Sequence, residues 1–171
     1  MSTGRRQILG AAGAAAGLWA FASLYGNSRS ASAATGATPA KFEVMRTEEE
    51  WRKLLSPNAF EILRHEATER PFSSPLNEEH RAGRFSCAGC QLPLFSSKTK
   101  FDSGTGWPSF WQPLPQAVGE NRDSTLGMVR TEIHCRRCGG HLGHVFDDGP
   151  KPTGLRYCMN GFAMQFTAGT A

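Results

Sequence analysis

The five cysteines of this 171-residue chain divide into two pairs and one single residue. The pairs are "CAGC", with Cys87 and Cys90, and "CRRC", with Cys135 and Cys138, about forty-five residues further on. Two intervening residues allow a tight turn to direct both sulfurs at one ion, and a second such turn completes a tetrahedral site. We therefore predict one structural zinc ion held by all four thiolates, which leaves no open position for catalysis.

Three other interpretations of the paired cysteines remain open. Two disulfides would suit an oxidising compartment, and a CxxC pair can also be a thioredoxin-like redox motif. Neither pair follows a strand and opens a helix, which argues against the redox motif, and "GG" after Cys138 suits a metal knuckle because glycine tolerates a left-handed backbone. A zinc ribbon that binds nucleic acid is the third alternative.

The fifth cysteine, Cys158 in "GLRYCMNGF", has no partner in this scheme. An unpaired thiol in an exported protein is either a mispairing hazard or a group kept free for chemistry. Asn160 lies two residues on and shares its face in a strand, and His141 and His144 in "HLGHVFDDGP" are spaced to lie on one side of a turn. A thiol, an amide and imidazole proton donors suit the reduction of an oxygen-bearing substrate. The alternative is a buried small apolar residue beside two structural histidines.

The first residues indicate export. Arg5 and Arg6 precede an apolar run rich in Ala and Gly, and "SASAA" then offers a small-residue cleavage site after Ala33. We predict a twin-arginine-type signal over residues 1–33, a linker over 34–41 and one domain over 42–167, exported to the bacterial periplasm. The run is too dilute in Leu to favour a stable membrane span, although a retained amino-terminal anchor is the alternative.

Removal of the signal changes the charge of the protein. Arg5, Arg6 and Arg29 are the only charged residues of that segment, so the net charge falls from +4 to +1 over the remaining 138 residues. A protein of this charge lacks the basic surface that nucleic-acid binding requires. We therefore expect no nucleic-acid partner. The length of 138 residues is that of a single domain with its own core.

Two short helices are expected at the start of the domain. Thr47 followed by Glu50 is a capping-box pattern, and Trp51, Leu54 and Leu55 would share one apolar face. A second helix is expected to begin with Ser56 as its N-cap and Pro57 at its first position. Its buried face would be formed by Phe60 and Leu63.

Beyond residue 80 the chain indicates strands. Runs such as "RFSC", "KFDSG", "LGMVRTEIHC", "GHVFD", "LRYCMN" and "AMQF" are separated by Gly, Pro, Asp and Ser, which is typical of antiparallel strands with tight turns. In the third run Met128, Val129 and Ile133 alternate imperfectly with polar residues, so one face is expected to be buried. The predicted fold is mainly β, with small helices on its amino-terminal side.

Four segments in order, "CAGCQLPLFSS", "KFDSGTGWPSF", "CRRCGGHLGHVFDDGP" and "PTGLRYCMNGFAMQF", closely resemble the methionine-R-sulfoxide reductases of the B class. The resemblance runs from Glu43 to Phe166. It implies two antiparallel β-sheets with small flanking helices, and a Cys₄ zinc site distal to the active site. It also implies reduction of the R epimer of methionine sulfoxide in proteins and peptides.

The same resemblance suggests roles for individual residues. Cys158 corresponds to the nucleophile that attacks the sulfoxide sulfur and becomes a sulfenic acid. Trp107 in "GTGWPSF" corresponds to the residue that packs on the substrate's S-methyl group, and we expect Phe110 of the same tract to contact substrate. The polar set that orients and protonates the sulfoxide oxygen corresponds to His141, His144 and Asn160.

Two positions depart from the family's pattern. Thr105 stands where many members carry the cysteine that resolves the sulfenic acid, so an external thioredoxin-like protein or small thiol must act as reductant. Gly161 stands where serine is common, a change expected to have little effect on the chemistry but to loosen the turn after Asn160. We expect a monomer. A thiol peroxidase or redox sensor, and a zinc module without activity, are the competing functions.

Overall fold

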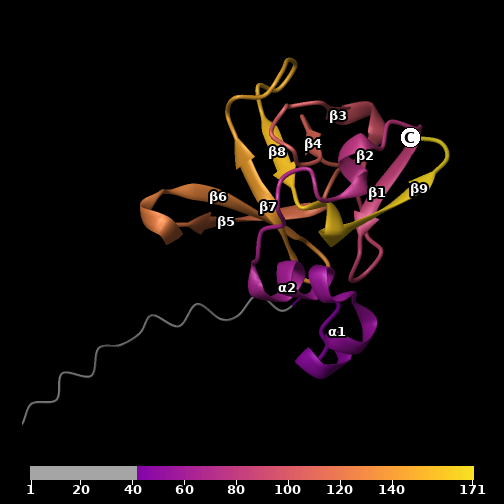
Figure 1. Ribbon diagram of the computed structural model, residues 1–171, viewed down its shortest axis with the longest axis vertical. Coiled ribbons are helices and arrows are strands. Elements are labelled where there is room, and N and C mark those ends of the chain that lie inside the picture. Colours follow the sequence, from indigo (N-terminus) through magenta and orange to yellow (C-terminus); the bar gives the residue numbers. More distant parts are fainter. Residues whose placement is uncertain (1–41) are drawn as a thin grey trace, which may run out of the picture. The chain divides into compact units, whose positions relative to one another are not determined.

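The computed structural model describes residues 42–171, so the predicted signal (1–33) and linker (34–41) lie outside the described residues. In this part of the chain nine strands form two antiparallel sheets, which confirms the predicted fold class. A six-stranded sheet has the order β3-β4-β8-β7-β6-β5, and a three-stranded sheet has the order β2-β1-β9. Figure 1 shows the small sheet beside the large one, with the two α-helices beneath them. The strands are β1 Gly83–Cys87, β2 Pro93–Ser96, β3 Lys100–Phe101, β4 Ser109–Phe110, β5 Val118–Asp123, β6 Arg130–Cys135, β7 His141–Phe146, β8 Arg156–Met159 and β9 Met164–Ala168.

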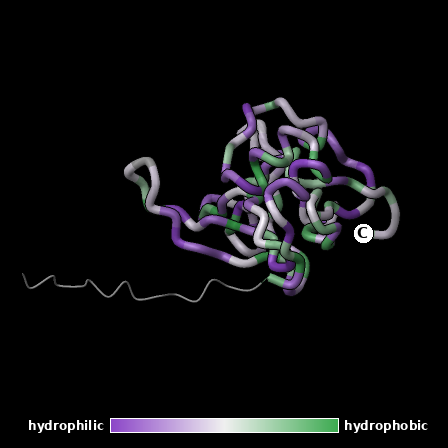
Figure 2. Tube along the Cα trace, turned by 90° about the horizontal axis from the view of Figure 1, so that it is seen from below, coloured by the Kyte–Doolittle hydropathy of each residue, from purple (hydrophilic) through white to green (hydrophobic). Residues whose placement is uncertain are grey.

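The core lies between the facing sides of the sheets. Phe85 of β1 meets Phe110 of β4 edge to face, and Phe95 of β2 stacks on Phe110 with ring centroids 4.3 Å apart. All three rings are fully buried, as is Ile133 of β6. Figure 2 shows the hydrophobic segments gathered inside the body and the hydrophilic ones along its outer turns. Burial of these aromatic rings supplies much of the driving force for folding.

The two helices begin where their capping signals predict. Helix α1 (Glu48–Leu54) starts after Thr47, and the reciprocal bonds between Thr47 and Glu50 form the capping box. Helix α2 (Pro57–His65) starts after Ser56, whose hydroxyl accepts from the Ala59 N–H. Within residues 42–171 no helix is long and apolar enough to cross a membrane.

One predicted helix face is wrong in part. Trp51 and Leu55 are buried, but Leu54 is exposed. Helix α1 has only seven residues and ends at Leu54, so its single buried row is formed by Trp51 and the C-cap Leu55, four residues apart. The buried face of α2 is as predicted and includes Phe60 and Leu63.

The third predicted strand is shorter than its sequence run. Met128 and Val129 are exposed and precede β6, which begins at Arg130. They follow the short 3₁₀ helix η3 (Thr125–Gly127), which connects β5 to β6. Only Ile133 of the predicted apolar alternation is in the core. Strands β2, β4 and β5 were not predicted, because their short segments lack a clear alternation of apolar and polar residues.

Candidate active site and metal centre

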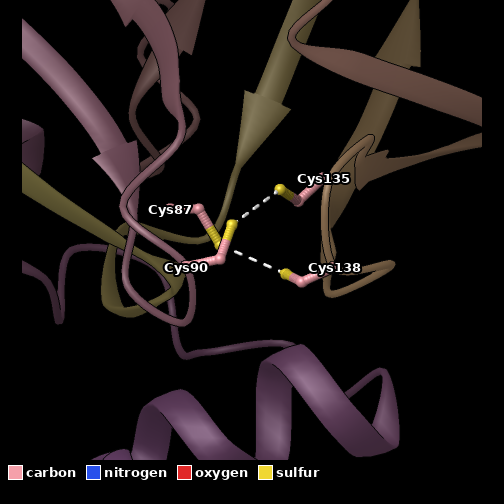
Figure 3. Close-up of side chains that lie close together, drawn as sticks. All are labelled: Cys87, Cys90, Cys135 and Cys138. Atoms are coloured by element: carbon pink, nitrogen blue, oxygen red, sulfur yellow. Dashed lines mark hydrogen bonds between the residues drawn. The ribbon is translucent and has the colours of Figure 1, made fainter. Parts of the chain in front are cut away.

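The four paired cysteines converge on one point between the two sheets, as Figure 3 shows. Cys87 ends β1, Cys135 ends β6, and Cys90 and Cys138 lie in the turns that follow. The sulfurs of Cys87 and Cys138 are 3.7 Å apart, those of Cys90 and Cys135 are 3.4 Å apart, and all four lie within 4.8 Å of one another. A zinc ion with Zn–S bonds of about 2.3 Å requires sulfur separations of about 3.8 Å. The cluster therefore fits a tetrahedral Zn²⁺ ion.

The two CxxC turns repeat the same backbone geometry. Gln91 and Gly139, which follow the second cysteine of each turn, have φ values of 62° and 68°. Their N–H groups donate to the carbonyl oxygens of Cys87 (2.9 Å) and Cys135 (2.8 Å). Gly139 meets the predicted need for a left-handed residue without steric cost, while Gln91 adopts the same conformation with a side chain.

Two guanidinium groups compensate the charge that the metal site would carry. Zinc with four thiolates has a net charge of −2, which neighbouring cations stabilise. Arg64 of α2 donates to the carbonyl oxygen of Cys138 (3.2 Å), and Arg137 donates to that of Cys90 (3.3 Å). This donor set and its surroundings suit a closed structural site.

Cys158 lies in the middle of β8 and is partly exposed. Its neighbours across the sheet are Ser109 of β4 and His144 of β7. The hydroxyl of Thr105 lies 3.9 Å from the Cys158 sulfur. Burial raises the pKa of the Cys158 thiol, while the Thr105 hydroxyl and the positive charge of Arg156 act in the opposite direction. Burial has the larger effect, so the pKa of the Cys158 thiol lies above its ordinary value.

A cavity of about 150 Å³ opens over Cys158. This volume suits a single unbranched side chain more than a drug-sized ligand. Four of the predicted site residues line it, namely Trp107, His144, Cys158 and Asn160. The four metal-site cysteines do not contribute to its walls, so the structure separates the two centres, as the resemblance implies. The cavity also has four lining residues that the sequence analysis did not identify: Thr68, Arg130, Gly143 and Phe146.

Phe110 is not in this cavity, contrary to the prediction. Its side chain is fully buried and packs between Phe85 and Phe95. Phe110 is one residue beyond Ser109, the neighbour of Cys158, so the alternation of strand β4 directs it to the opposite face of the sheet. The phenylalanine that lines the cavity together with Trp107 is Phe146.

The two histidines lie on strand β7 and not on a turn, which corrects the predicted local structure. Residues three apart in a regular strand face opposite sides, yet these rings are 5.4 Å apart. The cause is a β-bulge, because His134 pairs with His141 while Ile133 pairs with Gly143. The extra residue reverses the alternation and brings both histidines to one side. Of the two, only His144 lines the cavity, and His141 is almost fully buried behind it.

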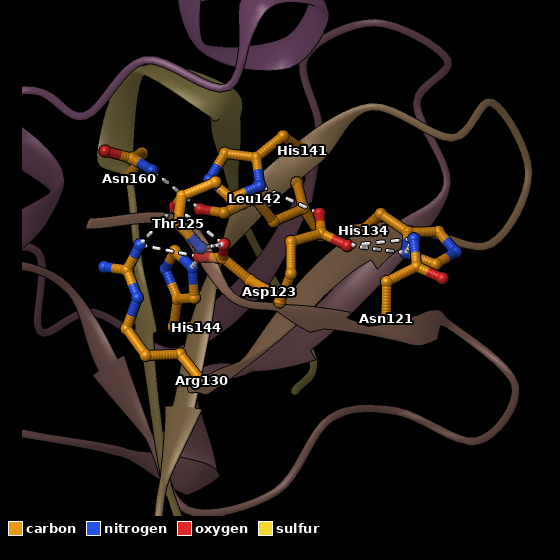
Figure 4. A network of polar contacts seen from close by, with 10 residues as sticks. Asn121, Asp123, Thr125, Arg130, His134, His141, Leu142, His144 and Asn160 are labelled. Atoms are coloured by element: carbon orange, nitrogen blue, oxygen red, sulfur yellow. Dashed lines mark hydrogen bonds and ion pairs between the residues drawn. The ribbon is translucent and has the colours of Figure 1, made fainter. Parts of the chain in front are cut away.

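Each histidine is held by a carboxylate, one on β6 and one on β5, within the polar network drawn in Figure 4. His141 Nδ1 donates to Glu132 Oε1, and His144 Nε2 donates to Asp123 Oδ2, both at 2.8 Å. An ionised carboxylate accepts only, so these bonds fix opposite tautomers and leave His141 Nε2 and His144 Nδ1 free of a proton in the neutral rings. Burial lowers the pKa of His144, an effect that Asp123 partly offsets.

The acidic members of this network are themselves held in their charged form. Burial raises the pKa of Glu132, but bonds from His134 and His141 outweigh this effect and lower its pKa to about 2. Bonds from Thr125, His144 and Arg130 hold the pKa of Asp123 well below its usual range. His141 Nε2 is buried and has no hydrogen-bond partner in residues 42–171, so it can hold a water molecule or a substrate atom.

The space beside Gly161 is occupied by a side chain that the sequence analysis did not consider. A Cβ atom at Gly161 would overlap the Cβ and hydroxyl of Ser74, the N-cap of the short 3₁₀ helix η1 (Pro75–Glu78). A larger residue at position 161 therefore cannot be accommodated beside Ser74 without movement, so this position affects packing; the expectation that it has little effect on the chemistry stays a prediction.

We predict that Gly161→Ser lowers the free energy of unfolding by about 1–3 kcal/mol through overpacking. Adding Ser74→Gly should restore most of that loss, because it vacates the same space. Urea unfolding of the two single variants and the double variant measures the coupling. Strictly additive effects would show that the two positions do not compete for space.

No short sequence pattern marks the carboxylates Asp123 and Glu132. Glu132 lies within a strand between Thr131 and Ile133, and Asp123 ends another strand. One signal was available for Phe146, because it lies two residues after His144 and so faces the same side of β7.

Comparison with known proteins identifies relatives that match most of the described domain. The family model for the SelR domain matches residues 55–168. A peptide methionine sulfoxide reductase MsrB of Agrobacterium fabrum is 57% identical over 125 residues, which cover 72% of this chain and 93% of the relative. The enzyme of the same name from Bradyrhizobium diazoefficiens is 56% identical over 124 residues, covering 72% and 89%. Its counterpart in Leptospira interrogans is 51% identical over 126 residues, covering 73% and 96%.

Proposed function

The chain belongs to the SelR family, and on this premise we propose that it is an oxidoreductase that reduces methionine sulfoxide in oxidised proteins and peptides to methionine. Identity of 51–57% to MsrB enzymes supports the activity. The single observation that carries the chemistry is the cavity in which Cys158, His144, Asn160 and Trp107 meet. The finer assignments below, to the R epimer and to individual residues, are part of the same proposal.

The proposed reaction begins with Cys158. Its thiolate sulfur attacks the sulfoxide sulfur, and a transient bond between the two sulfurs forms. The substrate S–O bond and this S–S bond then break as the oxygen bonds to the Cys158 sulfur, which leaves a sulfenic acid on Cys158 and releases methionine. Two electrons pass from the Cys158 sulfur to the substrate sulfur. The thiol proton ends on the transferred oxygen, so the step takes up no net proton. External thiols then reduce the sulfenic acid, which yields a disulfide of the reductant and one water.

His144 is the residue best placed to move this proton. It is the register partner of Cys158 across β7 and β8 and lines the same cavity. Its Nδ1 atom is free because Nε2 is bound to Asp123. We assign to His144 the transfer of the thiol proton to the oxygen, and to His141 and Asn160 the orientation of that oxygen. Trp107 is assigned to the S-methyl group, as an apolar surface that selects the R epimer.

The metal site has a structural part in the proposal. Zn²⁺ held by Cys87, Cys90, Cys135 and Cys138 would join the end of β1 in the small sheet to the end of β6 in the large one. When bound, the ion supplies binding free energy to the folded state and takes no part in oxygen transfer. We further propose a monomer with a thioredoxin-like protein or small thiol as reductant.

The test of the function is a single-turnover assay with diastereomerically pure methionine sulfoxide in a peptide, R against S, without added reductant. About one equivalent of methionine from the R epimer alone, with Cys158 recovered as sulfenic acid, is expected. Faster oxidation of Cys158 by hydrogen peroxide than by the sulfoxide would favour a thiol peroxidase. No methionine from either epimer, with zinc bound and Cys158 reduced, would indicate a zinc module without this activity.

The position of Thr105 leads to a sharp prediction. Its hydroxyl is within 3.9 Å of the Cys158 sulfur, so a cysteine there has its sulfur near the nucleophile. In the Thr105→Cys variant the introduced thiol is expected to condense with the sulfenic acid of Cys158 after one turnover. The resulting disulfide is detected by mass spectrometry as the loss of one water and as a linked peptide. The Thr105→Cys, Cys158→Ser double variant serves as the control and forms no such link. Persistent sulfenic acid in the single variant would show that the loop cannot reach the required S–S geometry.

We also propose that residues 1–33 are a cleavable twin-arginine-type signal for export to the periplasm. Expression of the full chain in a bacterium with that pathway is expected to yield periplasmic protein that begins at Ala34. Intact mass and amino-terminal sequencing measure the cleavage, and Arg5→Lys with Arg6→Lys should block export. Protein that keeps residue 1 and stays in the cytoplasm would contradict this assignment.

A further inference from the structure

Glu69 is a buried carboxylate that the proposed mechanism does not use. It lies in the connection between α2 and η1 and is 8% exposed. Its two oxygens accept the backbone N–H groups of Gly161 (2.8 Å) and Phe162 (2.9 Å) at the start of the 3₁₀ helix η4 (Gly161–Ala163). In the described part of the chain no cationic side chain forms an ion pair with it. Burying a carboxylate costs free energy when only neutral groups compensate its charge. A buried Glu69 therefore indicates that this side chain has a structural or functional role.

The main chain of Glu69 contacts two residues of the cavity. Its N–H donates to Asn160 Oδ1 (3.0 Å), and its carbonyl oxygen accepts the indole Nε1–H of Trp107 (3.1 Å). Asn160 Nδ2 in turn donates to the carbonyl oxygen of Leu142 (3.1 Å), so the amide is held at both ends. One amide N–H of Asn160 remains for the cavity.

These contacts link Glu69, Asn160 and Trp107 to one another. The side chain of Glu69 is attached to the segment that directly follows Asn160, and its main chain holds the side chains of Asn160 and Trp107. Asn160 follows β8, while Trp107 precedes β4. Displacement of Glu69 would therefore move the amide and the indole together, although Glu69 itself is not among the residues that line the cavity.

We propose that Glu69 is a positioning residue that sets the orientation of Trp107 relative to Asn160, and thereby the selection of the R epimer. The inference rests on the proposed function, in which the indole faces the S-methyl group and the amide faces the sulfoxide oxygen. The two epimers differ only in which of the methyl group and oxygen lies on which side of sulfur. Discrimination between them therefore requires both contacts to be fixed at the same time.

The test compares Glu69→Gln with the wild-type protein. Glutamine has nearly the same volume, but its NH₂ group must face one of the two backbone N–H donors, so one bond is lost and two donors oppose each other. We expect kcat/KM for the R epimer to fall about tenfold to a hundredfold. The ratio of R to S turnover should fall with it.

A second readout separates positioning from general damage. Glu69 has no contact with the Cys158 sulfur, so alkylation of Cys158 by iodoacetamide in the free enzyme should stay within about twofold of wild type, with zinc still bound. In a Trp107→Phe background, where the indole N–H is absent, Glu69→Gln should cost less than in the wild type. Glu61→Gln is the matched control and should leave activity and selectivity unchanged, because Glu61 lines the same 290 Å³ cavity as Glu69 but is exposed.

Several outcomes would overturn the inference. Unchanged R selectivity in a folded Glu69→Gln protein is one, and an equal loss for both epimers together with slower alkylation is another. If Glu69→Gln does not fold, Glu69→Asp keeps the charge and is measured in the same way; failure of both variants to fold would make Glu69 a stability residue. A wild-type protein that reduces neither epimer would instead refute the proposed function.

Discussion

Replacing Cys158 with serine is expected to lower kcat/KM for methionine-R-sulfoxide by more than about a thousandfold. A serine hydroxyl is a far weaker nucleophile than a thiol at neutral pH and cannot take up oxygen as a stable sulfenic acid. The polar groups around the sulfur, including Thr105 and His144, would remain in place. Methionine formed from the R epimer in a peptide, in the presence of excess dithiol, measures the loss.

The same variant should keep its fold and its metal. Cys158 lies apart from the four-cysteine cluster, and its serine replacement is nearly isosteric. We expect one zinc ion per chain by elemental analysis and an unfolding midpoint close to that of wild type. Turnover above about one per cent of wild type would place the nucleophile elsewhere.

Replacing Cys87 or Cys135 with serine is expected to produce the largest change in stability. Apparent binding free energies of structural zinc are on the order of 10 kcal/mol, comparable with the whole stability of a domain of this size. Each of these cysteines ends a strand in a different sheet, so loss of the ion would also release the connection between β1 and β6. Zinc content and urea unfolding measure the effect. Adding a strong chelator to the wild-type protein at moderate urea should likewise remove zinc and unfold the domain.

Cys158→Ser is the matched control for these variants, since it makes the same chemical change at the one cysteine outside the cluster. The metal variants should lose zinc and unfold at lower urea, whereas the control should lose only activity. A Cys87→Ser protein that is free of metal and as stable as wild type would refute the structural role. Retention of full zinc content would show that three sulfurs suffice to bind it.

Much of the local structure could be predicted because its signals span only a few residues. Thr47 with Glu50, and Ser56 with Pro57, mark helix starts through bonds within a single turn. The CxxC spacing likewise encodes each metal turn, and Gly139 has the left-handed backbone expected of it. The sequence also singled out Cys158, because four of the five cysteines have a common explanation and one does not.

Two predictions failed where the outcome depends on more distant residues, and a third, that His141 and His144 lie on one side, holds on a strand and not on the expected turn. Leu54 is exposed because α1 ends there, and Phe110 faces the core because β4 pairs Ser109 with Cys158. The histidines lie together through a bulge against β6, whose register no pattern within "HLGHVF" reveals. In each case the pairing of strands or the end of an element determines which side a residue faces.

The sequence by itself determined the family, the cluster of four cysteines and the lone thiol, because these depend on residue type and short spacing. Only the tertiary structure decided which groups surround that thiol. Asp123 and Glu132 set the tautomers of the two histidines, and Glu69 joins Asn160 to Trp107. Glu69 and Asn160 are 91 positions apart in the chain. Ser74 occupies the space that a side chain at position 161 would need, over a similar separation. Such contacts arise only when packing brings distant segments together, so no local pattern of residues encodes them.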